Sequence, residues 1–420
     1  MDSKLQKTID TIAANGRSAA LALQDITTEK INKTLLDMAK LLAKEAVFLK
    51  KANAKDLSAG RKKGLSPAML DRLTLSEKAL NSMINGLKEV AVLPTSVGTR
   101  YEQQTRPNGL NICKMRTPIG VVGIIYESRP NVTVDAAAIC LKSHNAVILR
   151  GGSEAFNSNM ALISLFQKAA ESNKLPSGAI QFIPSTDRAA IDHLLTKDEQ
   201  IDLIIPRGGE SLIRAVVEKS RIPVIKHYKG VCHVYVSNKA DMNKALPIVI
   251  NAKVQRPGVC NAMETLLLSN KLSVSNRRQI VNALIEKGVT LFGDAVSREL
   301  SQAIQAATED DWRAEYLDLR CAVRTVNNVE EAIEHINTYG SHHTDAIVTE
   351  HQKEADRFVQ MVDSASVMVN ASTRFADGGE YGMGCEIGIS TDKLHSRGPM
   401  GIDDLTTYKW IVEGSGQIRQ

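Results

Sequence analysis

A chain of 420 residues, 43% of them apolar, is long enough to bury a large core, and its length favours two or three domains. The net charge is only +5 and aromatic residues make up 4%, so the chain lacks the clustered basic and aromatic side chains of a nucleic-acid-binding surface. No apolar run approaches the roughly 20 residues of a membrane-spanning helix, and the N-terminus lacks the apolar core of a signal peptide. We therefore expect a cytoplasmic protein with no membrane segment and no nucleic-acid partner.

The cysteines predict neither disulfides nor a metal centre. They are scattered along the chain at positions 113, 140, 232, 260, 321 and 385. In a cytoplasmic chain such thiols stay reduced. No Cys-x-x-Cys pair occurs, and neither Cys232-His233 nor His342-His343 has the spacing of a zinc site. The prediction is no metal.

About the first 90 residues are predicted to be helical. Ile31, Leu35, Met38 and Leu42 recur at the spacing of one helix face. Ser66-Pro67 is typical of a helix start, with a capping serine followed by proline at the first helical position.

Residues 98–116 change character and predict a β-hairpin around the turn Pro107-Asn108-Gly109. The hairpin has little apolar content of its own, so we expect it to protrude and pack on a partner. Residues 405–412 alternate polar and apolar side chains, which suits an edge strand.

From residue 119 onward, strands and helices alternate, which predicts parallel sheets covered by helices. The first series comprises strands at 119–126, 146–149, 180–183 and 203–205, with helices at 132–142, 157–173 and 211–219. The second comprises strands at 232–236, 265–268, 289–292, 322–326, 346–348 and 367–369, with helices from 240, at 275–287, at 329–339 and from 352. The boundary between two such α/β domains is expected near residues 228–230.

Residues 253–262 hold Cys260 on a loop broken by proline and glycine. A cysteine is nucleophilic as the thiolate, and nearby cations favour that form. Lys253 and Arg256 are candidates for those cations if the fold turns them inward. The alternative is an inert buried cysteine in a connecting loop.

Two Arg-Gly-Gly motifs follow predicted strands and suggest phosphate binding. They are Arg150-Gly151-Gly152-Ser153 and Arg207-Gly208-Gly209. Ligands of open α/β sheets bind at the carboxyl ends of strands, and glycine lets backbone approach a phosphate. Ordinary tight turns are the alternative. The usual G-x-G-x-x-G fingerprint of dinucleotide binding does not occur.

Three further segments have both a functional and a structural interpretation. Asn131, at the start of a predicted helix, could donate its amide to an oxyanion or simply cap that helix. Residues 370–388 form a long, glycine-rich loop of a kind that is often functional. His342-His343 precedes a strand, where a structural role is the more common one.

Taken together, these motifs resemble the gamma-glutamyl phosphate reductase family of the aldehyde dehydrogenase superfamily, nearly end to end. The segments that carry the resemblance are 126–135, 146–152, 255–257 with Cys260-Asn261, 326–336, 339–341, 343–347, 370–375, 397–401 and 405–410. The resemblance implies an aldehyde-dehydrogenase-like α/β fold with a Rossmann-like cofactor domain (1–97 and 117–229), a catalytic domain (230–390) and a β flap for oligomerisation (98–116 and 404–420).

The implied activity is the NADPH-dependent reduction of L-glutamyl 5-phosphate to L-glutamate 5-semialdehyde, with release of phosphate, in proline synthesis. The resemblance implies Cys260 as nucleophile, Asn131 as oxyanion donor and Glu315 near the nicotinamide ribose. Arg150, Gly151, Gly152, Ser153, Arg207, Gly208 and Gly209 are the other expected NADP contacts. Arg129, Arg256, Arg374 and Phe375 are the expected substrate contacts. A homo-oligomer and a functional partnership with glutamate 5-kinase are also implied.

The sequence departs in one respect from the aldehyde dehydrogenase superfamily, and this departure bears on which reaction the chain catalyses. Acid-forming aldehyde dehydrogenases carry a glutamate that activates water, on the segment joining the two domains. Here that segment, Lys219 to Ala240, contains no Asp or Glu. This argues against an acid-forming NAD(P)-dependent aldehyde dehydrogenase. A nucleotide-binding or scaffold protein with an inert Cys260 is the alternative outside the enzymes.

Overall fold

The computed structural model describes residues 2–127, 129–384 and 386–419. The described chain divides into two compact units. Unit 1 is Met1–Lys226 with Gly382–Gly388 and Met400–Gln420, and unit 2 is His227–Tyr381 with Ile389–Pro399. The chain first passes from one unit to the other between residues 226 and 227, next to the expected boundary. Each unit is described by itself below.

The N-terminal part of unit 1 is helical, as predicted. Its helices are α1 Ser3–Leu23, α2 Thr28–Lys44, α3 Ala46–Lys62, α4 Pro67–Leu73 and α5 Glu77–Val92. The Ser66 side chain accepts from the amide of Met69 at the start of α4, which is the predicted cap. The predicted apolar face of α2 is buried.

The sheet of unit 1 is parallel, in the strand order β5-β4-β3-β6. Its strands are β3 Val121–Tyr126, β4 Ala146–Arg150, β5 Ile180–Phe182 and β6 Leu203–Arg207. The helices that alternate with them are α6 Pro130–Lys142, α7 Phe156–Ser172, α8 Arg188–Leu194 and α9 Glu210–Lys219. All residues of β3 and β4 are buried, as expected for a parallel sheet covered on both faces.

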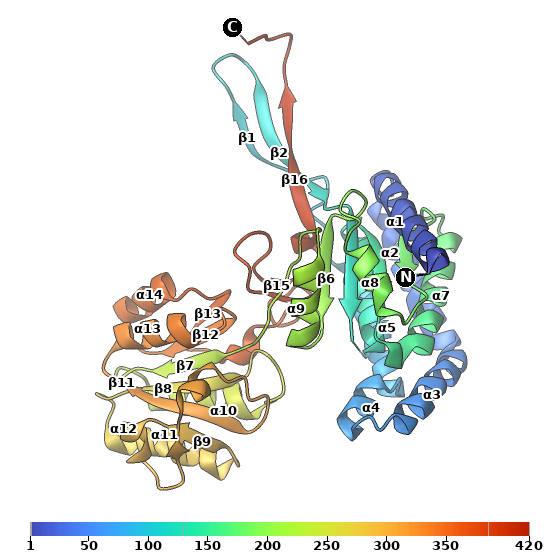
Figure 1. Cartoon of the computed structure of the whole chain (residues 1–420). Coiled ribbons are helices and arrows are strands. Elements are labelled where there is room, and N and C mark those ends of the chain that lie inside the picture. Colours follow the sequence, from blue (N-terminus) through green and yellow to red (C-terminus); the bar gives the residue numbers. More distant parts are fainter. Residues whose placement is uncertain (1, 128, 385, 420) are drawn as a thin grey trace. The chain divides into compact units, whose positions relative to one another are not determined.

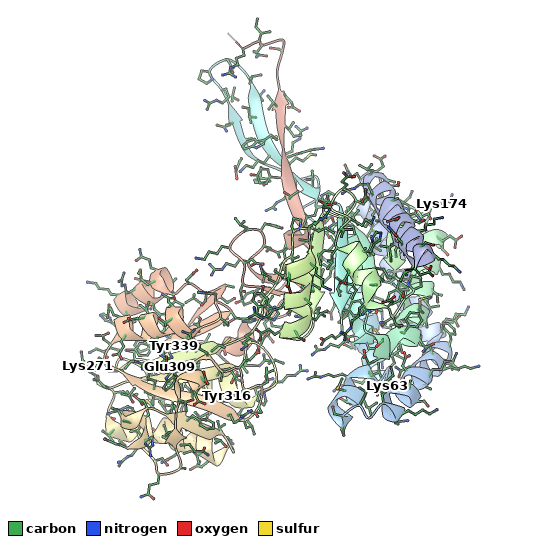
Figure 2. The ribbon with its side chains drawn as sticks, viewed as in Figure 1. Lys63, Lys174, Lys271, Glu309, Tyr316 and Tyr339 are labelled. Carbon is green, nitrogen blue, oxygen red and sulfur yellow. The ribbon has the colours of Figure 1, made fainter. Side chains whose placement is uncertain are left out.

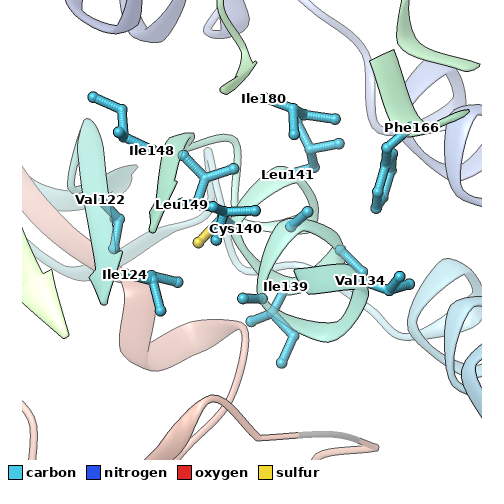
Figure 3. Close-up of a cluster of buried hydrophobic side chains, with 14 of the residues drawn as sticks. Val122, Ile124, Val134, Ile139, Cys140, Leu141, Ile148, Leu149, Phe166 and Ile180 are labelled. Carbon is cyan, nitrogen blue, oxygen red and sulfur yellow. The ribbon is translucent and has the colours of Figure 1, made fainter. Parts of the chain in front are cut away.

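Apolar side chains from this sheet and its helices form the core of unit 1 (Figure 3). This core includes Val122 and Ile124 of β3, Ile148 of β4, Ile139 of α6 and Phe166 of α7. The sequence prediction missed the short helix α8, because one turn or two of helix carries too little periodicity to be recognised.

A separate antiparallel sheet belongs to unit 1 and confirms the predicted hairpin and C-terminal strand. It consists of β1 Arg100–Thr105, β2 Asn111–Pro118 and β16 Thr406–Glu413, in the order β1-β2-β16 (Figure 1). Lys114 of β2 lies over the rings of Tyr408 and Trp410, 4.7 and 5.1 Å from their centroids.

Unit 2 contains a parallel sheet in the order β10-β9-β11-β8-β7-β12-β13. Its strands are β7 Cys232–Val236, β8 Met263–Ser269, β9 Thr290–Gly293, β10 Gln305–Ala306, β11 Arg320–Val326, β12 Thr344–Val348 and β13 Ser366–Val369. Its helices are α10 Met242–Val254, α11 Val274–Glu286, α12 Ala295–Arg298, α13 Val329–Tyr339 and α14 Gln352–Met361. Helices α10 and α11 pack on one face of the sheet and α13 and α14 on the other (Figure 1).

Short elements complete the fold. The sequence did not predict β10, α12, or the paired strands β14 Gly388–Ser390 and β15 Gly398–Met400. The 3-10 turns are η1 Ser153–Ala155, η2 Glu309–Arg313, η3 Thr373–Phe375 and η4 Asp403–Leu405. In the described part of the chain, every helix is too short or too polar to cross a membrane.

A buried carboxylate on α3 holds the start of α7. Asp56 is 2% exposed, and its oxygens accept from the amides of Asn157 (3.1 Å) and Ser158 (2.7 Å). They also accept from the Asn157 side-chain amide (2.7 Å) and the Ser158 hydroxyl (2.6 Å). The N-cap residue of α7, Ala155, has no side-chain acceptor, so Asp56 supplies the missing cap from another helix.

Replacing Asp56 by alanine should therefore destabilise unit 1 by about 3 kcal/mol, because buried donors of the first turn of α7 lose a charged acceptor. Urea unfolding followed by circular dichroism measures the change. Asp56→Asn is the matched control and should lose less, since an amide retains one acceptor. A loss within about 0.5 kcal/mol for the alanine variant, typical of an inconsequential surface change, would contradict this assignment.

Candidate active site

Cys260 lies on the loop between α10 and β8, as predicted, and it differs from the other described cysteines. Cys113, Cys140, Cys232 and Cys321 are buried, whereas Cys260 is half-buried. Burial raises the pKa of the Cys140 and Cys232 thiols well above the ordinary value, so both stay protonated. Cys385 lies outside the described residues. Cys260 is therefore the described thiol with the accessibility that a nucleophile needs.

The backbone of Cys260 is held by the turn that enters β7. A Cβ atom placed on Gly230 would lie 1.9 Å from the carbonyl oxygen of Cys260, so only glycine fits there. Two residues later, the Cys232 thiol donates to the same carbonyl oxygen, 3.2 Å away. The amide of Gly230 in turn donates to Oε1 of Glu315 (2.8 Å), and that of Val231 donates to Oγ of Ser341 (2.8 Å).

Two histidines that the sequence analysis did not place at the site lie beside Cys260. A ring nitrogen of His227, a ring nitrogen of His343 and the Cys260 sulfur all lie within 4.8 Å of one another. His343 is fully buried, with Nδ1 2.9 Å from Oγ1 of Thr344, and His227 is half-buried. The two rings meet edge to face, with centroids 5.6 Å apart.

Topology explains why these residues meet. Cys260, Gly230 and His343 precede β8, β7 and β12, which are neighbours in the sheet of unit 2. The residues therefore gather at the amino ends of adjacent parallel strands. Residues 227, 260 and 343 are too far apart in sequence for any spacing motif to find, and the usual rule places ligands at the carboxyl ends instead.

Arg374 forms hydrogen bonds that hold the neighbouring loop in place. Its guanidinium donates to Oε1 of Gln255 (2.8 Å) and to Oδ1 of Asn261, and the Asn261 amide donates to the Ala376 carbonyl (2.9 Å). Burial lowers the pKa of Arg374, and the neighbouring charge of Arg256 acts in the same direction.

The other expected substrate residues near this loop are more accessible. Arg256 is exposed and forms no ion pair with any described residue, while the Phe375 ring is 49% exposed. Both can meet a ligand without first breaking a contact.

The Lys253 side chain points inward, but its ammonium pairs with a carboxylate rather than with the Cys260 thiol. Its ammonium is fully buried and lies 2.6 Å from Oε2 of Glu264, which is also buried. Burial raises the pKa of Glu264 to about 7, and Lys253 acts against that rise. The charge of Lys253 is thus already matched by Glu264, whereas Arg256 on the Cys260 loop and Arg374 beside it remain candidate cations.

Glu315 lies in a segment anchored at both ends within unit 2. The Tyr339 hydroxyl donates to Oε1 of Glu309 (2.6 Å), and that of Tyr316 donates to Oδ1 of Asp311 (2.7 Å; labelled tyrosines and Glu309 in Figure 2). The Glu315 carboxylate accepts a hydrogen bond from the Gly230 amide. Its expected contact with a nicotinamide ribose stays a prediction.

In unit 1, both Arg-Gly-Gly motifs lie at the same edge of the sheet. β3 lies between β4 and β6, with Ile125 opposite Arg150 and Tyr126 opposite Arg207. A Cβ on Gly151 would lie 2.1 Å from Nδ2 of Asn159, and one on Gly208 would lie 2.6 Å from the Glu127 carboxyl carbon. Neighbouring side chains therefore fill the space where a Cβ would stand, so both positions require glycine.

Arg150 is more buried than the sequence analysis assumed, with 8% of its surface exposed. Nη2 donates to the Thr186 carbonyl (3.2 Å), whereas Nε has no hydrogen-bond partner among the described residues. Burial lowers its pKa, and the nearby charge of Arg188 acts in the same direction. Arg188, exposed at the start of α8, is a second cation that the sequence analysis missed because the helix itself was missed.

The remaining predicted cofactor residues also lie at this edge. Gly152 is the N-cap of η1, and the Ser153 hydroxyl donates to Oε1 of Glu154 (3.1 Å). Gly209 is the N-cap of α9, and Nη2 of Arg207 lies 4.0 Å from Oε1 of Glu386.

Asn131 lies in the first turn of α6, where Arg129 is the N-cap and Pro130 the first helical residue. The alternative that Asn131 caps this helix is therefore wrong. Its exposed amide donates to Oδ2 of Asp135 (3.0 Å), whose pKa burial raises to about 6. Both side chains line a cavity of about 200 Å³, also lined by Arg72. Ser128 of the same motif lies outside the described residues.

Comparisons with known proteins identify the family of the chain. The aldehyde dehydrogenase family model matches residues 2–301. The chain is 55% identical to the gamma-glutamyl phosphate reductase of Geobacter metallireducens over 412 residues, covering 98% of this chain and 99% of the relative. It is 54% identical to the enzyme of the same name from Moorella thermoacetica, with the same coverage.

Solved structures give the same result. The crystal structure of gamma-glutamyl phosphate reductase from Thermotoga maritima aligns with a TM-score of 0.96 at 42% identity, covering 98% of this chain and all of that one. An acetylating aldehyde dehydrogenase from Geobacillus thermoglucosidasius aligns at 0.69 with 18% identity over 99% of this chain and 98% of that one, which shows a shared fold. The chain therefore belongs to the gamma-glutamyl phosphate reductase family, a group of oxidoreductases with the aldehyde dehydrogenase fold.

Proposed function

We propose that this chain reduces L-glutamyl 5-phosphate to L-glutamate 5-semialdehyde with NADPH and releases phosphate, through a thioester on Cys260. This reaction is the second step of proline synthesis from glutamate, and its product cyclises spontaneously. The observation that best supports the proposal is an accessible cysteine, held by its backbone and placed beside two imidazoles. A thiol so placed suits attack on an activated acyl group.

The first step is formation of the thiolate. His227 and His343 are the bases nearest to Cys260, and either neutral imidazole can take up the thiol proton. The resulting imidazolium would stabilise the thiolate, as would the charges of Arg256 and Arg374. Cys232 stays protonated and keeps its hydrogen bond to the Cys260 carbonyl, so the loop retains its position.

The thiolate then attacks the acyl carbon of the substrate, and the carbon–oxygen bond to phosphate breaks. The acyl phosphate brings roughly two negative charges, by analogy with phosphate monoesters. Exposed Arg256 is the cation available to those charges in unit 2, and Arg129 is the corresponding candidate in unit 1. The imidazolium can return its proton to the departing phosphate. Asn131 is proposed to donate its amide to the oxyanion of this step, which requires it to exchange its contact with Asp135.

The carboxyl edge of the sheet in unit 1 fits a nicotinamide dinucleotide. Buried Nε of Arg150 offers a donor without a hydrogen-bond partner among the described residues. Arg207, Gly209 and Arg188 surround the same edge, and Glu315 is the candidate for the ribose. When bound there, NADPH supplies the hydride that reduces the thioester. Cys260 leaves as the thiolate when the thiohemiacetal collapses to the aldehyde.

The β1-β2-β16 sheet is proposed to join copies of this chain. Most of β1 is exposed, and Tyr408, Trp410 and Val412 of β16 are 46–55% exposed. An unpaired edge strand with exposed apolar side chains favours association with another sheet. The family resemblance adds glutamate 5-kinase, which makes the acyl phosphate, as a proposed functional partner.

The decisive test is the reverse reaction, with glutamate semialdehyde and NADP. NADPH should accumulate only when phosphate or arsenate accepts the acyl group from Cys260. The segment Lys219 to Ala240 offers no carboxylate to activate water. Such base assistance is worth about 10²–10⁴-fold.

Cys260→Ala should abolish this activity while NADPH fluorescence still reports cofactor binding, and Cys113→Ser is the matched control that should retain activity. Steady NADPH production without phosphate, near the phosphate-supplied rate, would instead indicate an acid-forming aldehyde dehydrogenase. Substantial activity in the alanine variant would exclude the thioester.

Arg150 should set the preference for NADPH over NADH, because a guanidinium can bind a 2′-phosphate bidentately. Arg150→Ala should reduce the ratio of the two kcat/KM values by about 10- to 100-fold, as expected for losing a charged hydrogen bond. Arg188→Ala shows whether the second cation shares this role. An unchanged ratio in the Arg150 variant would refute the assignment.

Alanine variants of Arg256 and Arg374 should differ in their effects, because the two arginines make different contacts. Arg256→Ala should raise KM for phosphate far more than KM for NADP, with little change in thermal stability, because Arg256 forms no ion pair with a described residue. Arg374→Ala should lower thermal stability as well, because it removes the contacts to Gln255 and Asn261. Equal rises in KM for phosphate, semialdehyde and NADP in the Arg256 variant would point to a structural role instead.

A further inference from the structure

The side chains of His227, Cys260 and His343 form a set of potential metal ligands that the proposed reaction does not require as such. One ligand atom of each residue lies within 4.8 Å of the other two. Two imidazoles and a thiolate are the donor types that zinc prefers. His343 is buried, whereas His227 and Cys260 are half-buried, so an ion held by all three would keep one side open to water.

The three ligands are carried by segments that are fastened to one another. Gly230, close in sequence to His227, packs against the backbone of Cys260. The Val231 amide donates a hydrogen bond to the hydroxyl of Ser341, close in sequence to His343. The ring of His343 is further oriented by Thr344. Such outer contacts fix the direction of a ligand and strengthen metal binding.

The geometry requires little movement. Zinc–nitrogen distances of about 2.0–2.1 Å and zinc–sulfur distances of about 2.3 Å place tetrahedral ligands roughly 3.5 Å apart. The present separations are at most 4.8 Å, so each pair needs to close by at most about 1.3 Å, which rotation of the half-buried His227 and Cys260 side chains can supply. Three protein ligands with an open fourth position is the arrangement of an exchangeable zinc site rather than a closed structural one.

We propose that His227, Cys260 and His343 bind one zinc ion, and that this ion reversibly blocks Cys260. The zinc ion loses water ligands and gains the Cys260 sulfur and two imidazole nitrogens, while the thiol proton passes to solvent. No electrons are transferred. A sulfur bound to zinc shares one lone pair and much of its negative charge with the metal, which suppresses its attack on an acyl phosphate. The binding stands on the geometry alone, and only the block rests on the proposed role of Cys260.

Cobalt(II) is the probe for the site, because a thiolate bound to it gives a near-ultraviolet charge-transfer band. The purified full chain titrated with cobalt should develop this band to one equivalent, and added zinc should remove it. Cys260→Ser should abolish the band. His227→Asn and His343→Asn should each weaken cobalt binding by more than the 10- to 100-fold that loss of an outer contact causes.

Controls separate this site from other ligands. His351→Asn, an exposed histidine at the start of α14, and Cys113→Ser should leave the titration unchanged. His227 is only half-buried, so its variant remains informative if the His343 variant fails to fold. No band in the unmodified chain, or a band that survives His227→Asn undiminished, overturns the site.

Inhibition is measured separately, in the phosphate-dependent assay. Zinc should inhibit at the occupancy given by competition with cobalt, and a chelator should restore activity fully. A zinc-occupied enzyme that remains active overturns the block and also counts against Cys260 as the nucleophile. A missing band combined with the expected inactivity of Cys260→Ala overturns only the metal site.

Discussion

The close approach of Gly230 to the backbone of Cys260 is the constraint on which the candidate site depends. There is no space for a Cβ atom at Gly230, since it would overlap the Cys260 carbonyl. That contact fixes the loop after α10 against the turn before β7. The Cys232 thiol donates to the Cys260 carbonyl, and the Glu315 carboxylate accepts from the Gly230 amide. The Ser341 hydroxyl accepts from the Val231 amide and so connects this turn to the segment before β12. The Cys260 sulfur is therefore accessible, while the backbone that carries it is held in place.

A buried ion pair lies at the base of the same loop. Lys253 lies in the last turn of α10 and Glu264 is the second residue of β8, so their contact ties together the two elements that flank Cys260. Glu264 also accepts from the amide of Leu317, in the segment that carries Glu315. Breaking a buried pair by removing one partner is strongly destabilising, because the other charge is left without compensation. The pair therefore favours one arrangement of the loop, whatever it contributes to stability.

The sequence predicted the fold better than the site, for a physical reason. Strands such as β3 and helices such as α2 carry their own signal, because burial of a sheet or of one helix face imposes a pattern on neighbouring residues. Cys260 was found because proline and glycine break its loop.

His227 and His343 were not found as site residues, because the sheet order that places β12 beside β7 is a long-range property. Lys253 was assigned to the thiol because its partner, Glu264, could not be paired with it from sequence. Arg188 was overlooked because the helix that it begins, α8, is too short to be recognised from sequence periodicity.

The identity of the groups around Cys260 is consistent with a reaction that handles phosphate. Like charges about 4 Å apart repel by about 4 kcal/mol at the effective dielectric constant of a protein surface. A free carboxylate beside the nucleophile would therefore oppose an incoming or departing phosphate. Two carboxylates of unit 2 near this loop are engaged elsewhere, Glu264 with Lys253 and Glu315 with the Gly230 amide. Neutral or protonated imidazoles can transfer a proton without that repulsion, so replacing a carboxylate base by histidines suits phosphate, rather than water, as the acyl acceptor.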